Sequence, residues 1–336
     1  MQENRRLRDE IKALGEDIDS NFAALKNGDC GKDFQLGSAS FQHVDVGRNR
    51  VLRITGESTW YLKIPLKYVD TAIDNEDAGL TRIQGTIEKL PQYQPIAEAR
   101  VSREKGYILT AEIEGEQLNY GFYRACLSVL PRRMKEINQC FFNLGVVAAT
   151  FHQENKGYKG ECSSKDVYDS LQRRIERLTH SDNLIEKILK WFEINKSVDE
   201  NTTFIHGNLS LKNILCSGEK IGLLDFEACG AGQRYHDMAT LCRDIIACRS
   251  AAFFPWKRAQ ASLLAFLEGY KSIYPYDKKI LLNHVAAFFF ARYLQVYHLK
   301  KQKESIAGIP VTKFRFVKLV NEFLDGRACS LFEPGS

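Results

Sequence analysis

The sequence predicts an α+β fold of two lobes, a small β-rich lobe followed by a larger helical lobe, with an amphipathic helix in front of both. Short runs with strand character fill positions 34–115, whereas helical periodicity dominates positions 116–330. A two-strand hairpin at 214–227 interrupts the helical part. The chain has 336 residues, 44% of them hydrophobic, including 20 Phe and 14 Tyr, and is therefore large enough to bury a sizeable core.

Positions 1–30 predict the leading helix. Apolar residues recur there every three or four positions, which is the spacing of one helix face. These residues are Ile11, Leu14, Ile18, Phe22 and Leu25. We expect this stripe to pack on the body of the same chain, and self-association of two chains through the helix is the alternative.

The small lobe is predicted to contain three strand pairs and one helix. The first pair is FQLGSASFQHVDV (34–46), which reads as a strand, a turn of small residues and a second strand. RVLRI (50–54) and TWYLKIPL (59–66) are short β runs joined by Gly-Glu-Ser, which indicates a hairpin. Helical texture follows at 71–90, and a third strand pair spans 99–118. A short connector near 112–115 then leads into the larger lobe.

The larger lobe is predicted to be helical around one inserted hairpin. One apolar stripe runs through Ile137, Phe141, Leu144, Ala148 and Phe151. Further helices are expected at 166–178, 183–194, 236–249, 258–273, 277–299 and 312–325. The exception is the sequence ILC-SGEK-IGLLDFE, which reads as two strands joined by a tight turn.

Charge and cysteine usage exclude several protein classes. A net charge of +5 is smaller than a dedicated nucleic-acid binder usually carries, so no nucleic-acid partner is expected. The nine cysteines include no C-x-x-C pair, which predicts reduced thiols and a cytoplasmic location. The charged N-terminus does not resemble a signal peptide, and no apolar run is long enough to predict a membrane span.

Two side chains at the outer ends of the predicted hairpin indicate a metal site. Asn213 precedes the first strand and Asp225 follows the second, so the hairpin brings an amide and a carboxylate side by side. Oxygen ligands of this kind suit Mg²⁺, which is usually bound through one or two protein oxygens together with phosphate and water. His206-Gly207-Asn208 lies one short turn earlier, and Asn208 should face the same site.

These motifs resemble those of a known family. H-G-N-x-x-x-x-N at 206–213 is similar to the H-G-D-x-x-x-x-N catalytic loop of the aminoglycoside phosphotransferase and choline kinase superfamily, and LLDFEACGAGQRYHDMATL at 223–241 is similar to its metal-binding segment. The resemblance spans roughly 34–325, although its specific motifs cover only 206–241. It implies a bilobal protein-kinase-like fold, ATP and Mg²⁺ as cofactors, and a small-molecule hydroxyl acceptor such as a sugar or an amino alcohol.

The resemblance also implies roles for single residues. Asp225 matches the aspartate that holds Mg²⁺ on the ATP phosphates, and Asn213 matches the second metal ligand. The connector matches the hinge whose backbone bonds adenine, here Glu112 and Ile113. The phosphate-covering loop should lie near 37–40, where small residues replace a full glycine-rich motif.

A strand lysine and a helix carboxylate complete the implied nucleotide site. Lys63 matches the lysine that reaches the α- and β-phosphates, and Lys67 is its competitor. Because Lys63 lies among apolar neighbours, it should have an acidic partner. Glu76 is the natural partner and Asp77 the second choice.

Asn208 is the main departure from the family pattern. The aspartate usual there accepts the proton of the substrate hydroxyl, whereas an amide can orient the hydroxyl but cannot hold its proton. Lys212, four residues later, would contact the γ-phosphate or an acidic acceptor, or else face solvent, and Glu227 is a weaker candidate proton acceptor. The chain is therefore expected to be an ATP-dependent phosphotransferase, slow because of Asn208. The alternative is a nucleotide-binding pseudokinase with a regulatory or scaffolding role.

The remaining expectations concern residues around the site. His206 and Asp237 are expected to be structural, the latter as a cap or a brace of the loop. Four apolar residues either wall the adenine pocket or belong to the ordinary core: Leu52, Ile54, Ile64 and Leu215. The C-terminal third is neutral to basic, which favours a neutral or anionic acceptor over a polycationic aminoglycoside.

Overall fold

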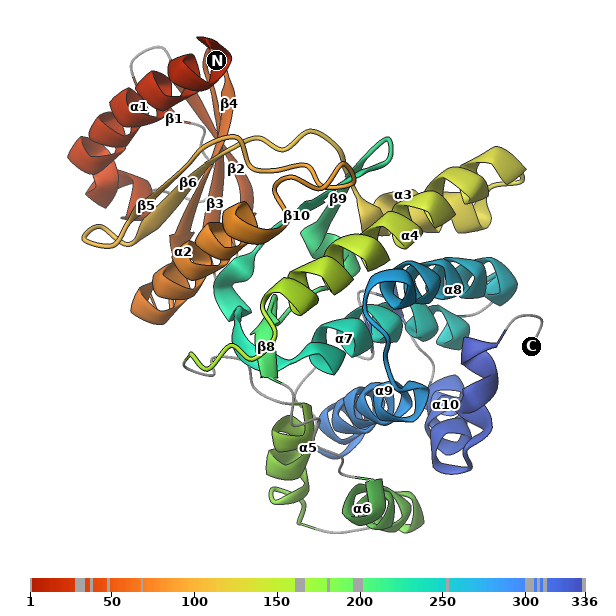
Figure 1. Cartoon of the computed structure of the whole chain (residues 1–336). Coiled ribbons are helices and arrows are strands. Elements are labelled where there is room, and N and C mark those ends of the chain that lie inside the picture. Colours follow the sequence, from red (N-terminus) through yellow and green to blue (C-terminus); the bar gives the residue numbers. More distant parts are fainter. Residues whose placement is uncertain are drawn as a thin grey trace.

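A computed structural model of the chain describes residues 2–27, 34–36, 39–46, 49–67, 69–160, 167–179, 182–195, 202–251, 254–299, 305–306, 309–310 and 313–333. A small sheet-containing lobe and a larger helical lobe lie against each other (Figure 1). The predicted α+β fold class is therefore confirmed. Of the expected phosphate-covering loop, positions 37 and 38 lie outside the described residues.

The small lobe is built on a six-stranded antiparallel sheet. Its strand order is β1-β2-β3-β4-β6-β5. The strands are β1 (Phe34–Leu36), β2 (Ala39–Val46), β3 (Asn49–Thr55), β4 (Thr59–Pro65), β5 (Ala99–Ser102) and β6 (Tyr107–Ala111). Because side chains alternate along a strand, Leu62 and Ile64 of β4 face one side of the sheet and Lys63 faces the other.

Helix α1 (Gln2–Asn27) covers one face of this sheet. Its apolar stripe packs on Leu52, Ile54 and Ile64, which are almost fully buried beneath it. These three residues are therefore core under α1, and the interpretation that they wall an adenine pocket is wrong, because they point away from the face that carries Lys63. The stripe of α1 is buried within the chain, and self-association through the helix stays a prediction.

Helix α2 (Val69–Thr86) lies on the opposite side of the sheet and joins it to the other lobe (Figure 1). Gly79 of α2 meets Phe226 so closely that a Cβ added to the glycine would lie 2.6 Å from the Cβ of Phe226. A short strand β7 (Glu116–Gln117) then leads into the larger lobe, where it pairs with the inserted hairpin. Helix α2 and strand β7 thus contact the segments that carry the loop motifs.

Helices surround the short sheets of the larger lobe. Its first helices are α3 (Leu118–Leu127), α4 (Pro131–Glu154), α5 (Val167–Ile175) and α6 (Asn183–Asn195). The central segment contains β8 (Thr202–Ile205), η1 (Leu211–Asn213), β9 (Ile214–Ser217), β10 (Lys220–Leu223), η2 (Phe226–Ala228) and β11 (Gly230–Gln233). The chain continues through α7 (Arg234–Ala247), η3 (Cys248–Ser250), α8 (Trp256–Ile273), α9 (Lys278–Tyr293), the π-helical turn η4 (Leu294–His298), β12 (Ser305–Ile306), β13 (Ile309–Pro310), α10 (Lys313–Leu324) and η5 (Arg327–Phe332).

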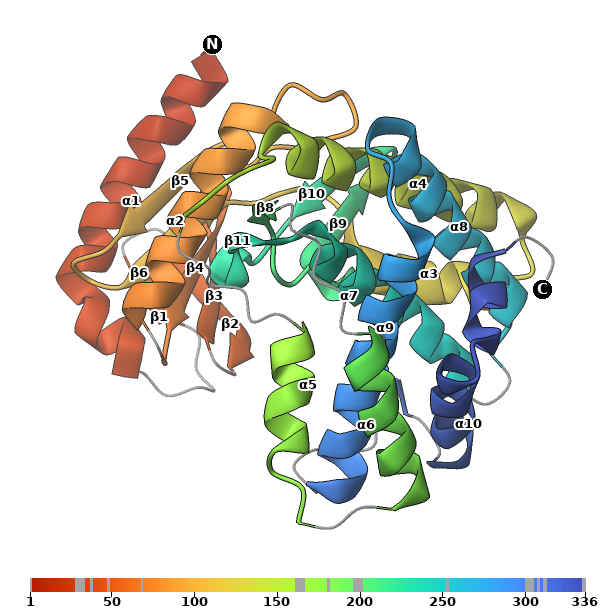
Figure 2. The same cartoon turned by 60° about the horizontal axis from the view of Figure 1, so that its bottom comes forward.

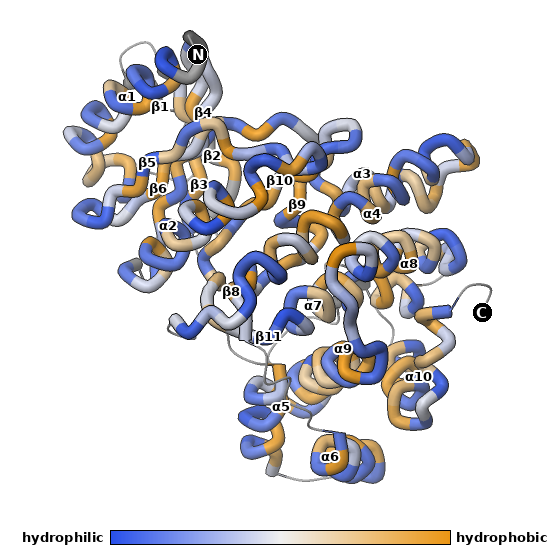
Figure 3. Tube along the Cα trace, in the orientation of Figure 1, coloured by the Kyte–Doolittle hydropathy of each residue, from blue (hydrophilic) through white to orange (hydrophobic). Residues whose placement is uncertain are grey.

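The larger lobe is divided between a central part and a helical extension. Helices α5 and α6 project away from the central segment and lie beside α9 (Figure 2). The tube in Figure 3 shows α9 mostly apolar, whereas polar and apolar residues alternate along α1. This matches the burial of α9 at the centre of the larger lobe. Among the described residues, no helix is long and apolar enough to cross a membrane.

Helices α4 and α8 approach closely through two glycines. A Cβ on Gly269 would lie 2.0 Å from the carbonyl oxygen of Phe142, and one on Gly145 would lie 2.2 Å from that of Phe266. We expect Gly269→Ala to lower the free energy of unfolding by about 1–3 kcal/mol, because the helices must separate to admit the methyl group. Denaturant unfolding measures this, with Gly85→Ala in α2 as the control, since a Cβ there meets nothing within 4 Å. Equal stability of the two variants would contradict the prediction.

One pair of cysteines differs from the expectation of reduced thiols throughout. Cys140 of α4 and Cys216 of β9 form a disulfide, with their Cα atoms 6.7 Å apart. The two are separated by 76 residues and meet only because β9 packs near α4, so no local spacing indicated the pair. The expectation is therefore wrong for Cys140 and Cys216. Five other described cysteines are free thiols: Cys126, Cys229, Cys242, Cys248 and Cys329.

Candidate active site

The loop after β8 is held in place by one buried carboxylate. Asp237, in the first turn of α7, accepts hydrogen bonds from the backbone N–H of His206 at 2.7 Å and of Gly207 at 2.8 Å. It also contacts His152 Nε2 at 3.1 Å. Burial alone would raise the pKa of Asp237, but the hydrogen bond and charge of His152 outweigh it and lower the pKa. The structure thus places Asp237 as a brace of the loop, one of its two predicted structural roles.

The second residue of the loop motif must be glycine. Gly207 has φ = 75°, and a Cβ there would lie 1.9 Å from the carbonyl oxygen of Ala228. The neighbouring His206 is buried, and its Nε2 lies 3.0 Å from the carbonyl oxygen of Leu224. Burial lowers the pKa of His206 and favours the neutral ring. These contacts agree with the structural role predicted for His206.

The hairpin β9–β10 brings Asn213 and Asp225 together. Its register pairs Ile214 with Leu223, and the backbone N–H of Leu224 donates to the carbonyl oxygen of Asn213 at 2.9 Å. Asn213 Nδ2 lies 3.5 Å from Asp225 Oδ2. Asp225 has φ = 67°, in the left-handed region. The two predicted metal ligands therefore lie side by side.

Lys63 connects the sheet to this pair. Its Nζ lies 2.9 Å from Glu76 Oε2, 2.5 Å from Asp225 Oδ1 and 3.6 Å from Glu227 Oε2. Burial alone would lower the pKa of Lys63, but the carboxylates of Glu76 and Asp225 outweigh it and raise the pKa. For Asp225, Lys63 in turn outweighs the effect of burial and lowers the pKa, with smaller contributions from His206 and Lys212.

The two alternatives to Lys63 and Glu76, which are Lys67 and Asp77, lie away from Asp225. Lys67 follows the end of β4 and is exposed to solvent. Asp77 pairs with Arg103 at 2.6 Å rather than with a lysine. Lys63 and Glu76 are therefore the two residues that the structure joins to Asp225.

The chemistry around Lys63 fits a divalent cation. Three carboxylates, those of Glu76, Asp225 and Glu227, surround one ammonium, so the group carries excess negative charge. Among the described residues, no cluster of three or more His, Cys, Asp or Glu side chains forms a preassembled metal site. A carboxylate and an amide, Asp225 and Asn213, suit Mg²⁺, which relies on phosphate and water for its other ligands.

The connector lies at the end of β6, with one of its backbone donors engaged. The N–H of Glu112 donates to the carbonyl oxygen of Thr59 at 3.0 Å, and the Glu112 carboxylate contacts Tyr61 and Arg53. Ile113 is buried against Gly222 of the hairpin. Because the N–H of Glu112 is already bonded to Thr59, the backbone of Ile113 is the better candidate partner for adenine.

Asn208 and Lys212 lie on the loop that Asp237 braces. The carbonyl oxygen of Asn208 accepts from Asn213 Nδ2 at 3.0 Å and from the backbone N–H of Ser210 at 2.7 Å. These bonds fix the backbone of Asn208, whose side chain is half-buried. Lys212 is exposed, and its charge acts on Asp225. Glu227 Oε2 accepts from Asn49 Nδ2 at 2.9 Å, and its role as a proton acceptor stays a prediction.

Two residues of α7 that the motif did not single out, Asp244 and His236, also contact the loop region. Asp244 Oδ2 accepts from the backbone N–H of Leu211 at 3.2 Å, while its Oδ1 accepts from Arg243. His236 Nε2 lies 3.1 Å from the carbonyl oxygen of Gly207. Asp244 follows Asp237 by two helical turns and shares its side of α7, which is the spacing that would have indicated it.

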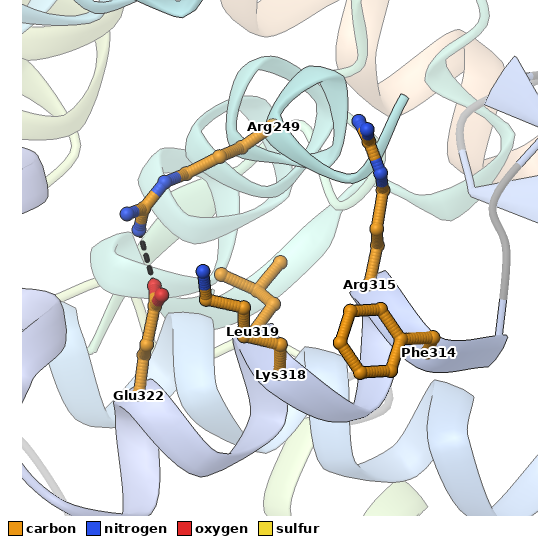
Figure 4. Close-up of a pocket in the computed structure, with 6 residues that line it drawn as sticks. All are labelled: Arg249, Phe314, Arg315, Lys318, Leu319 and Glu322. Carbon is orange, nitrogen blue, oxygen red and sulfur yellow. Dashed lines mark hydrogen bonds and ion pairs between the residues drawn. The ribbon is translucent and has the colours of Figure 1, made fainter. Parts of the chain in front are cut away.

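A cavity of about 270 Å³ lies outside this arrangement. It is lined by residues of α10 together with Arg249, whose guanidinium pairs with Glu322 (Figure 4). The lining residues are Arg249, Phe314, Arg315, Lys318, Leu319 and Glu322. None of the predicted site residues lines it, so the cavity is separate from the candidate active site.

Comparisons with known proteins agree with this architecture. The chain resembles the amicoumacin kinase hAmiN, solved in complex with AMP-PNP, Ca²⁺ and Ami, at 16% identity and a TM-score of 0.59 over 96% of this chain and 98% of that one. It also resembles the macrolide 2′-phosphotransferase MphH of Brachybacterium faecium at 15% identity and a TM-score of 0.52, over 95% and 99% of the two chains. A choline/ethanolamine kinase family protein of Mesorhizobium loti aligns at 14% identity and a TM-score of 0.53 over 96% of each chain.

These likenesses establish the fold, and the family follows from a sequence profile. A search of curated proteins found no match. The profile described as the phosphotransferase enzyme family matches residues 44–275, which include the loop, the hairpin and Lys63. The resemblance seen in the motifs is thereby confirmed, and the chain belongs to the phosphotransferase enzyme family.

Proposed function

We propose that the protein is an ATP-dependent phosphotransferase that acts on a hydroxyl group of a small molecule. The observation that carries this proposal is the contact of Lys63 with Glu76 and Asp225, beside Asn213. The kinase-like relative crystallised with AMP-PNP and Ca²⁺ supports a nucleotide cofactor. The nucleotide would lie against residues 34–115 and the acceptor against residues 116–330, in a protein of the cytoplasm.

The proposal assigns a task to each residue of the nucleotide side. Lys63, oriented by Glu76, would bind the α- and β-phosphates, and the backbone of Ile113 would bind adenine. Asp225 and Asn213 would hold Mg²⁺, which supplies charge neutralisation on the phosphates when bound. The negative charge around Lys63 supports this assignment, because a free site with excess carboxylate favours the added cation.

Asn208 would position the acceptor. Its side-chain oxygen accepts a hydrogen bond from the acceptor hydroxyl and directs that oxygen at the γ-phosphorus. A bond then forms between the hydroxyl oxygen and phosphorus, the bond from phosphorus to the bridging oxygen of ADP breaks, and the hydroxyl proton passes to water. Phosphoryl transfer depends mainly on positioning and electrostatics, so the reaction would proceed without a base, but slowly.

Asn208 also favours a second candidate function. A protein that binds nucleotide without transferring phosphate would keep Lys63, Asn213 and Asp225 and would have no need of a proton acceptor. Such a pseudokinase would signal through shape or partner binding. The two candidates agree on nucleotide binding and differ in turnover.

Nucleotide binding is tested by thermal unfolding with and without Mg·ATP. We expect Mg·ATP to raise the melting temperature of the native protein, because a ligand that binds only the folded state stabilises it. Lys63→Met should reduce this ligand-induced rise, whereas Lys67→Met, which removes an exposed lysine, should leave it unchanged. ADP release with a panel of hydroxyl acceptors then separates the transferase from the pseudokinase.

The shift with ligand is compared within each variant, because Lys63→Met alters stability by itself. Removing Lys63 leaves three carboxylates without their cation, which costs about 3–5 kcal/mol in comparable buried pairs. No rise for the native protein would contradict both candidate functions. If Mg·ATP raises the melting temperature of Lys63→Met and Lys67→Met equally, the role of Lys63 is contradicted. If chelation of Mg²⁺ abolishes the rise in melting temperature, the metal assignment is supported.

A further inference from the structure

Three arginines from separate helices gather on the larger lobe. Arg174 of α5 donates through Nη2, and Arg292 of α9 through Nη1, to the same oxygen of Gln295, at 3.3 Å and 3.5 Å. Arg243 of α7 holds its guanidinium 5.1 Å from the ring centre of Phe288 on α9. Helices α5 and α7 both pack on α9, and α5 lies beside α9 in Figures 1 and 2. We name Arg174, Arg243 and Arg292 the arginine cluster.

The cluster concentrates positive charge where burial makes it costly. Burial lowers the pKa of Arg292, and the nearby charges of Arg243 and Arg174 lower it further. The described hydrogen bonds of Arg174 go to neutral oxygens, those of Ser170 and Gln295. Like charges brought together in a half-buried position repel one another, and an arriving anion relieves that repulsion.

The cluster is connected to the loop that carries Asn208. Arg243 donates to Asp244 Oδ1 at 2.6 Å, and the other oxygen of Asp244 accepts from the backbone N–H of Leu211. A second connection passes through His236, whose ring lies 5.3 Å from that of Phe288 and whose Nε2 lies 3.1 Å from the carbonyl oxygen of Gly207. The cluster is therefore linked to the loop through Arg243 and Asp244 and through Phe288 and His236.

The local backbone of the cluster supports a binding role. Gln295 lies in η4, a π-helical turn at the end of α9. Turns of this kind are rare and occur frequently at functional sites, because the extra residue redirects side chains. Here the turn aims Gln295 at Arg174 and Arg292 and fixes the spacing of two guanidinium groups.

We propose that the arginine cluster binds an anionic group of the acceptor, a phosphate or a carboxylate, while the acceptor hydroxyl lies at Asn208. Guanidinium groups bind both anions through paired, charge-assisted hydrogen bonds. The inference rests on the proposed function and names its substrate class. A phosphorylated or carboxylated hydroxy compound would be accepted, and its neutral counterpart would bind poorly.

Turnover of a matched acceptor set is the first test. ADP release is measured with glucose, glucose 6-phosphate and glucuronate, so that the neutral, phosphorylated and carboxylated forms of one hexose are compared. We expect a lower KM for at least one anionic form than for glucose. In Arg174→Gln and Arg292→Gln that KM should rise roughly 10- to 100-fold per arginine, with kcat little changed, because each removes a charge-assisted hydrogen bond.

Anion binding without turnover keeps this inference separate from the proposed function. Inorganic phosphate and acetate are titrated calorimetrically against the protein saturated with a non-hydrolysable ATP analogue, and against the protein alone. We expect binding of at least one anion that weakens in Arg174→Gln and Arg292→Gln and is partly retained in Arg292→Lys. The control is Arg132→Gln, which removes the charge of an exposed arginine on α4.

Each outcome decides the inference. Arginine-dependent anion binding in a protein that turns over none of the acceptors would support the cluster and count against the transferase. Glucose used as well as its anionic forms, or equal anion affinity in Arg132→Gln and Arg292→Gln, would overturn it. Absence of binding by both anions would overturn it as well.

Discussion

Asn208→Asp should raise phosphate transfer about 10²–10⁴-fold, the usual contribution of a general base. The substitution is nearly isosteric, and the backbone of residue 208 is already fixed by its bonds to Asn213 and Ser210. A carboxylate there accepts the hydroxyl proton that the amide cannot take. The measurement is kcat for ADP release with Mg·ATP and the best acceptor of the panel.

Asn208→Leu is the matched control for this result. Leucine has a similar volume but cannot orient a hydroxyl, so its rate should fall below that of the native protein. Equal rates for the Asn, Asp and Leu forms would show that position 208 does not contact the acceptor. A chain that stays inactive as Asn208→Asp while still binding Mg·ATP would favour the pseudokinase.

Asp225→Asn should lower turnover by roughly 10³-fold or more, because it removes the charged ligand proposed for Mg²⁺. Asparagine is the informative choice, since Asp225 has φ = 67° and asparagine tolerates this conformation better than alanine. The loss would then report on charge rather than on backbone strain. Single-turnover kinetics with saturating Mg·ATP measures it.

Asp77→Asn provides the control for Asp225→Asn. It removes a carboxylate that pairs with Arg103 on the surface of the small lobe, so its turnover should match that of the native protein. An Asp225→Asn protein that turns over as fast as Asp77→Asn would refute the assignment of Asp225. An equal loss of turnover in Asp225→Asn and Asp77→Asn would indicate a general effect of removing one negative charge.

Local patterns in the sequence predicted the central part of the site well. The hairpin could be read from its turn residues and the short strands around them, and the antiparallel register then places Asn213 next to Asp225. Lys63 was implied by the family resemblance, and Glu76 was expected as its partner because a charge within an apolar strand needs one. The functional roles of these residues stay predictions.

Long-range packing explains what the sequence did not show. The faces of β3 and β4 were open to two interpretations, since strand alternation states which residues share a face and not which helix covers it. Cys140 and Cys216 meet across 76 residues, and the arginine cluster combines three helices. None of these contacts produces a hydrophobic periodicity or a motif spacing in the sequence from which it could be predicted.

The burial of α1 on the sheet has a consequence for the opposite face. Leu62 and Ile64 are clamped beneath α1, and Lys63 stands between them on the same strand. The helix is also bonded to strands β4 and β5, where Glu10 accepts from Trp60 Nε1 and Asp19 accepts from Arg100. The direction in which Lys63 points is thus set partly by α1, which packs on the opposite face of the sheet. We therefore expect sequence changes in α1 to alter the position of Lys63 by changing the tilt of β4.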